Sequence, residues 1–74
     1  MTKSESNIAH YLGKGVPSAI FADDFDFESL IGLAKTARAC ETEMTITLSA
    51  KSVIGTIDRV CDEGKGYIKL DFRF

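Results

Sequence analysis

The residues in this chain that could do chemistry are few and widely spaced. His10 is the single histidine, and acid–base catalysis would need a nucleophile or carboxylate held close to it. Its position near the N-terminus argues against the preorganised geometry that such catalysis requires. Gly13-Lys14-Gly15 lacks the full glycine spacing and the Lys-Ser/Thr pair of a phosphate-binding loop. We therefore expect no catalytic residues and no enzyme activity.

A cluster of carboxylates offers a second kind of chemistry, the binding of a hard cation. Asp23, Asp24, Asp26 and Glu28 fall within six residues. Calcium loops place oxygen ligands at fixed alternate positions around a glycine and close with a later Glu, and this segment does not follow that plan. Carboxylates also gather where a helix begins, because they meet its unpaired N–H groups and positive dipole end. We predict a helix start with Asp26 as its N-cap, an acidic protein-binding patch being the alternative, and no metal or cofactor.

The two cysteines, Cys40 and Cys61, have apolar neighbours and no recurring metal-ligand spacing. Buried cysteine behaves as a small hydrophobic residue. We predict reduced, buried thiols in preference to a disulfide or a reactive role.

Aromatic and basic residues supply the candidates for binding. Phe21, Phe25 and Phe27 surround the acidic segment, and they either anchor the chain to the core or form an exposed protein-docking surface. Near the C-terminus, Tyr67, Lys69 and Arg73 alternate on one side of a predicted strand, an arrangement that can stack a base and neutralise phosphate, although Asp71 interrupts it. The candidate nucleic-acid residues are Lys51, Arg59, Tyr67, Lys69 and Arg73.

Size and charge limit what such residues can do. The chain has 74 residues and a formal net charge of −2, so it makes one small domain without a positive field to attract nucleic acid. A domain this short has a thin stability margin, and self-association is the stabiliser that remains when disulfides and metal are disfavoured. The longest run without charge, Gly15 to Ala22, has eight residues, too few to cross a bilayer. We expect a soluble, cytoplasmic homo-oligomer.

The elements that position these residues follow from hydrophobic periodicity. Apolar residues alternate with polar ones over 44–49 and 67–74, the pattern of half-buried strands. An amphipathic helix is predicted over Phe27 to Glu41, where it can cover the apolar face of a sheet. Residues 1–26 are expected to form an N-terminal arm that can include a short helix at 7–12, with an extended arm preferred to an edge strand at 19–22.

Residues 53–61 are ambiguous. Val53, Ile57 and Val60 fit a helical spacing, but β-branched residues dominate the segment and Gly55 lies inside it. A strand with a bulge near Gly55, followed by a turn at 62–66, is the preferred interpretation. The predicted fold is α+β, with one main amphipathic helix packed on a three-stranded antiparallel meander in a domain spanning 27–74.

Three short segments give this arrangement a family resemblance. Ile46-Thr-Leu48, Gly55-Thr-Ile57 and Ile68-Lys-Leu70 resemble the first motif of Sm-like domains, small SH3-like barrels that assemble into rings. The resemblance covers 27–74, departs in spacing at Leu48 to Gly55, and stops before the last two strands, so it implies at most an incomplete barrel. Gly55-Thr-Ile57 with the Lys-Gly-Tyr67 element is also similar to cold-shock domains, without their stacking aromatics.

These residues and the expected fold are compatible with two functions. The first is a small non-enzymatic interaction or assembly protein that self-associates and binds a protein partner, since a three-stranded meander has open edges that another chain can cover. The alternative is an oligomeric Sm-like protein that binds RNA or a nucleotide.

Overall fold

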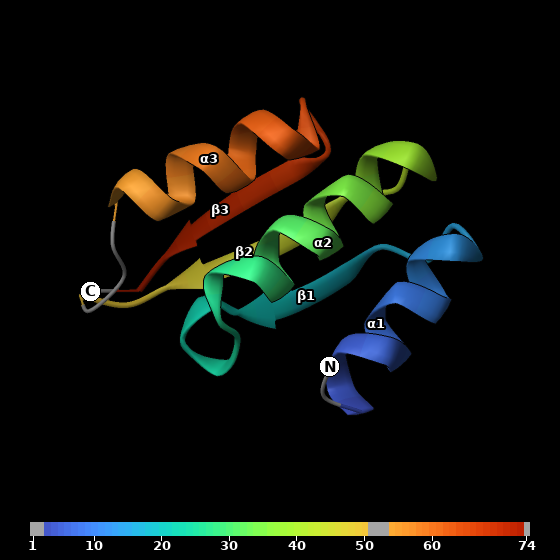
Figure 1. The fold of residues 1–74 in the computed structure, drawn as a ribbon, viewed down its shortest axis with the longest axis horizontal. Helices are drawn as coiled ribbons and strands as arrows, with labels where there is room; N and C mark the ends of the chain where they lie inside the picture. The colour runs from blue at the N-terminus through green and yellow to red at the C-terminus, as the bar shows by residue number, and fades with distance from the viewer. Residues whose placement is uncertain (1–2, 51–53, 74) are drawn as a thin grey trace.

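The computed structural model describes residues 3–50 and 54–73 of the chain. Helices and strands alternate along these ranges after a first helix (Figure 1). In chain order the elements are α1 (Lys3–Gly13), β1 (Ser18–Phe21), the short 3-10 helix η1 (Ala22–Asp24), α2 (Phe27–Ala39), β2 (Met44–Leu48), α3 (Ile54–Gly64) and β3 (Ile68–Phe72). Two of the three strands expected over 44–74 are therefore present, as β2 and β3, and each is preceded by a helix.

The three strands form one parallel sheet in the order β1-β2-β3. Residues 18–21 pair with 44–47, and residues 44–48 pair with 68–72. Because α2 and α3 each return the chain to the end where the previous strand began, neighbouring strands run in the same direction. The predicted antiparallel meander is wrong, as is the prediction of one main helix, and the described residues do not form the incomplete barrel built on it.

The source of that error is α3. Its buried residues Ile57 and Val60 face the core, while Asp58 and Arg59 are exposed, which is a helical spacing. β-branched residues lower helix propensity by only a few tenths of a kcal/mol each, whereas burying one aliphatic side chain contributes about 1.5–3 kcal/mol. Burial therefore outweighs propensity, and the preferred strand over 53–61 is wrong for the described residues from Ile54 onward. Val53 lies outside the described residues.

The start of α2 confirms the prediction made from its carboxylates. Asp26 is the N-cap, and its Oδ1 accepts a hydrogen bond from the backbone N–H of Ser29 at 2.8 Å. That bond favours the charged carboxylate and lowers the pKa of Asp26 below its ordinary value. The helix begins at Phe27 as expected and ends at Ala39, slightly earlier than predicted.

The N-terminal segment contributes β1 to the sheet and α1 to the helix layer. β1 pairs with β2, so the preferred extended arm over 19–22 is wrong. The predicted short helix is longer than expected, and its residue Leu12 is fully buried. Thr42 is also buried, and its hydroxyl lies 3.2 Å from the Leu12 carbonyl oxygen and 3.1 Å from that of Cys40. This hydroxyl connects the end of α1 to the turn that leads into β2.

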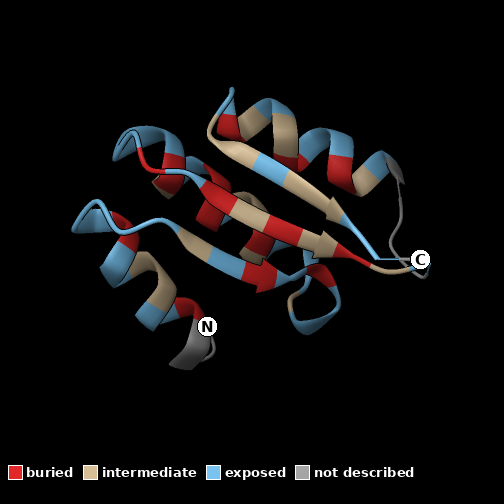
Figure 2. Ribbon diagram, turned by 180° about the vertical axis from the view of Figure 1, so that it is seen from behind, coloured by how far each residue is buried: buried red, intermediate tan, exposed pale blue. Residues whose placement is uncertain are grey.

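The helices cover one face of the sheet (Figure 1). The core between sheet and helices is built from fully or almost fully buried aliphatic residues: Leu12, Ile20, Leu30, Leu33, Ala34, Ala37, Met44, Ile46, Leu48, Ile57 and Val60. Seen from behind, the sheet lies in front of the helices and no described helix crosses it (Figure 2). A parallel sheet is normally covered on both faces, so this one-sided arrangement requires an explanation.

Candidate functional site

The uncovered side of the sheet is the candidate functional site, and we call it the open face. It consists of the residues that alternate with the core positions along each strand: Ala19, Phe21, Thr45, Thr47, Lys69 and Asp71. The register places them in two rows across the strands. One row is Ala19–Thr45–Lys69 and the other is Phe21–Thr47–Asp71. The β1 edge of the face is apolar, the centre is threonine, and the β3 edge is charged.

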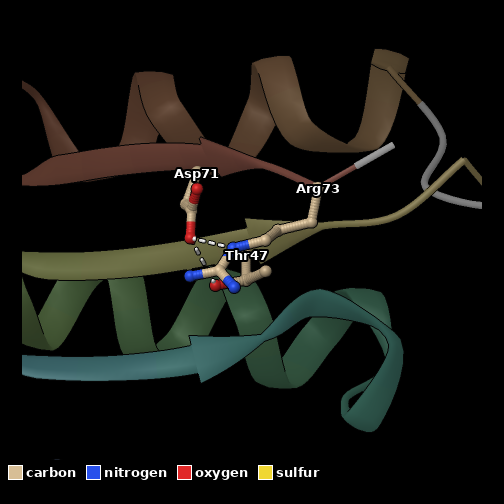
Figure 3. A network of polar contacts seen from close by, with 3 residues as sticks. All are labelled: Thr47, Asp71 and Arg73. Atoms are coloured by element: carbon tan, nitrogen blue, oxygen red, sulfur yellow. Dashed lines mark hydrogen bonds and ion pairs between the residues drawn. The ribbon is translucent and has the colours of Figure 1, made fainter.

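A polar network joins the centre of the open face to its β3 edge (Figure 3). Asp71 Oδ2 accepts a hydrogen bond from Arg73 Nε at 2.9 Å and one from the Thr47 hydroxyl at 3.4 Å. Figure 3 shows all three side chains on the side of the sheet away from the helices. The network holds the Asp71 carboxylate in place on the open face.

A second ion pair lies at the other end of β3. Lys69 Nζ is 2.9 Å from Glu43 Oε2, and this hydrogen bond raises the pKa of Lys69 above its ordinary value. Together with Asp71 and Arg73, these residues bring two cations and two carboxylates to the same side of the sheet. The charges cancel, so the open face carries alternating signs without a net field.

The three phenylalanines proposed for partner binding are placed differently from one another. Phe21 is on the open face and 61% exposed. Phe25 is half-buried and packs against the core, and Phe27 is 42% exposed at the start of α2, in the helix layer. The structure therefore combines the two alternatives, with Phe25 as an anchor and Phe21 as an exposed aromatic on a sheet surface.

The residues proposed for nucleic-acid binding do not form one surface among the described residues. Lys69 and Arg73 are on β3 and just after it, but each is paired with a carboxylate. Arg59 is exposed on α3, in the helix layer, and Tyr67 is half-buried against the core. Lys51 lies outside the described residues.

The remaining reactive side chains have local roles. Asp23 Oδ2 accepts a 2.6 Å hydrogen bond from the Ser49 hydroxyl, which joins the segments following β1 and β2. His10 is exposed and contacts Tyr11 edge-on, with ring centroids 5.1 Å apart. Within residues 3–50 and 54–73, no three His, Cys, Asp or Glu side chains gather as metal ligands, and no helix is long and apolar enough to cross a membrane.

Both cysteines have free thiols. Cys61 is half-buried against the core, and burial raises the pKa of its thiol. Cys40 is exposed, so the prediction that both thiols are buried is wrong for this residue. Its position explains the difference, because it caps the C-terminal end of α2 beyond the last turn that faces the sheet.

A shallow pocket lies between α2 and α3 in the helix layer, and none of its lining residues belongs to the open face. It has a volume of about 330 Å³ and is lined by Lys35, Arg38, Ala39 and Glu63. It combines two cations, Lys35 and Arg38, with the Glu63 carboxylate.

Comparisons of the chain with protein-family models, with curated proteins and with solved structures find no match.

The sequence could have indicated part of the open face. The alternation of Thr45 and Thr47 with core residues correctly predicted which side chains of β2 share a face. Asp71 was interpreted as an interruption of a basic stripe, whereas in the structure it is the acceptor that holds Arg73. The position of Phe21 beside Thr47 could not be found, because it depends on the parallel pairing of β1 with β2.

Proposed function

We propose that this protein is a small non-enzymatic assembly domain that associates through the open face of its sheet. The observation that carries the proposal is the one-sided cover of a parallel sheet, with every described helix on one face (Figure 2). Parallel sheets occur almost only with both faces covered. A second protein surface supplies the missing layer.

The residues of the open face suit a surface that is exposed to solvent in the monomer and covered by protein in the complex. Phe21 provides exposed aromatic area of the kind that concentrates binding energy. Thr45 and Thr47 are half-buried, and their hydroxyl and methyl groups suit both water and a packed interface. The charged residues lie at the β3 edge, where an interface normally has its polar rim.

The face is small, which sets the expected strength of association. Three strands spaced about 4.8 Å apart make a surface only about 15 Å wide, whereas a standard stable interface buries about 800 Å² on each partner. We therefore expect weak association, with a dissociation constant between micromolar and millimolar.

The test is the mass of the reduced protein in solution as a function of concentration. Sedimentation equilibrium from micromolar to millimolar concentration should give a mass that rises above 8.1 kDa. A reductant is needed because Cys40 is exposed and could cross-link copies. A mass of 8.1 kDa at every concentration would remove the proposal.

A matched pair of variants locates the surface. Phe21→Thr removes the aromatic ring from the open face but keeps a residue that favours strands, and it should raise the dissociation constant about tenfold or more. Phe27→Thr removes an exposed ring from the helix layer and should leave association unchanged. The reverse result would place the interface on the helices.

A further inference from the structure

The charges and side-chain sizes on the open face suit a second copy of the same chain. We propose that two copies stack face to face about a two-fold axis that lies between the sheets and runs across the strands, so that Lys69 of each copy meets Asp71 of the other. This arrangement rests on the proposed function and specifies its partner and geometry.

The two edges of the sheet are poor sites for pairing with another strand. In Figure 2, α1 projects past the β1 edge and α3 projects past the β3 edge. A helix beside an edge strand obstructs the approach of another sheet in the same plane. None of the described helices obstructs the open face in this way, so stacking is the accessible mode of association.

The stacking direction follows from the pattern of charge. A two-fold axis across the strands places each strand over its own copy in the reverse direction. When the axis passes between the two rows of the open face, Lys69 lies over Asp71 of the other copy and Asp71 lies over its Lys69. Opposite charges then meet at two symmetric positions.

The apolar edge of the face fits the same arrangement. In the same register, Phe21 on β1 lies over Ala19 of the other copy, so a large side chain meets a small one. At the centre, Thr45 lies over Thr47, where hydroxyls can hydrogen-bond and methyl groups can pack. Layers that interdigitate large and small residues fill the space between facing elements.

Other two-fold arrangements are worse. A shift by one row places Lys69 over Lys69 or Asp71 over Asp71, and like charges facing each other across an interface cost several kcal/mol. An axis that runs along the strands places β3 over β1. Asp71 then faces Phe21 and Lys69 faces Ala19, so each charged residue is covered by an apolar residue of the other copy. One register alone satisfies both the charges and the sizes.

Charge reversal with mixing tests the arrangement. Lys69→Glu should place Glu over Asp71 at both symmetric positions, and Asp71→Lys should place Lys over Lys69, so each variant alone should dimerise at least about tenfold more weakly than the wild type. An equimolar mixture of the two variants restores one opposite-charge pair at each position. The mixture should therefore associate within about threefold of the wild type.

Two control variants carry the same charge changes on the helix layer. Lys35→Glu and Asp58→Lys change exposed residues of α2 and α3 and should leave association unchanged. If the wild type associates but the mixture shows no rescue, the antiparallel stack is overturned and self-association stands. If the wild type remains a monomer, both proposals are overturned.

A measurement on the wild type protects the test against variants that fail to fold. Isotope-filtered NOE spectra of a mixture of labelled and unlabelled protein detect only contacts between copies. The arrangement predicts contacts between the Ala19 methyl and the Phe21 ring and between the methyl groups of Thr45 and Thr47. Filtered contacts from α2 or α3 instead would contradict it.

Discussion

The two faces of the β2 strand differ sharply, although they share one backbone. Met44, Ile46 and Leu48 are almost completely buried beneath the helices, and Thr45 and Thr47 between them are only half-buried. The first set carries the stability of the monomer, since aliphatic burial is the dominant favourable term in folding. The second set can change without unfolding the domain, which leaves it available for binding.

The largest expected difference is between neighbouring residues of β2. Ile46→Ala empties a fully buried position and should lower the free energy of unfolding by about 2–5 kcal/mol. Thr45→Val keeps the shape of a half-buried side chain and should change it by about 0.5 kcal/mol or less. Urea unfolding followed by circular dichroism measures both. If Ile46→Ala unfolds the domain outright, Ile46→Val should still cost about 0.5–1.5 kcal/mol.

Equal costs for Ile46→Ala and Thr45→Val would break the comparison, because they would mean that both faces are packed within the monomer.

A second pair of variants tests how closely the helix layer packs on the sheet. A Cβ added at Gly64 would overlap the side chain of Ile68, at the turn from α3 into β3. Gly64→Ala should therefore destabilise the protein by about 1–3 kcal/mol, although alanine favours helices. A Cβ at Gly55 meets open space, so Gly55→Ala should stabilise by about 0.5–1 kcal/mol. Chemical unfolding gives the sign of each change, and a stabilising Gly64→Ala would show that the turn packs loosely.

The smallest expected effect is on the pH dependence of stability. Asp26 in the helix layer acts at acid pH, and Lys69 on the open face acts at alkaline pH. The pKa of Asp26 is lowered, so its contribution to stability is present above its unfolded value near 3.8 and is lost as the pH falls through the folded value. The pKa of Lys69 is raised, so its contribution is present below its unfolded value near 10.5 and is lost as the pH rises through the folded value.

Asp26→Asn should flatten the acid side of the stability profile and leave the alkaline side unchanged. Lys69→Met should flatten the alkaline side and leave the acid side unchanged. Thermal unfolding between about pH 2 and about pH 12 tests both, because this range extends more than one unit beyond the ordinary pKa of each group. An unchanged acid side in Asp26→Asn would contradict the role of its N-cap bond.

The comparison also shows what local sequence patterns can predict. The helix from Phe27, its cap at Asp26 and the alternation of the strands at 44–48 and 68–72 were all predicted from short-range signals. These features depend on neighbours within a few residues, through hydrogen bonds near the helix start or the period of a strand.

The pairing of the strands depended on one ambiguous segment. Ile54–Gly64 contains Val, Ile and Thr, whose propensities favour a strand, and only the burial of Ile57 and Val60 under the fold makes it a helix. Strands that alternate with helices predict parallel pairing, whereas a strand at this position predicted a meander. The strand expected in place of α3 led to an antiparallel sheet, and the arm expected in place of β1 left one strand out of it. Together these errors hid the open face, which exists because the crossover helices α2 and α3 lie on the same side of the sheet.

The central claim is that the open face binds protein, and NMR spectra of the reduced wild-type protein across a dilution series test it residue by residue. The account predicts that the resonances of Ala19, Phe21, Thr45 and Thr47 shift with concentration while those of buried Ala34 and Val60 stay fixed. Spectra that do not change up to millimolar concentration, or shifts confined to α2 and α3, would contradict it.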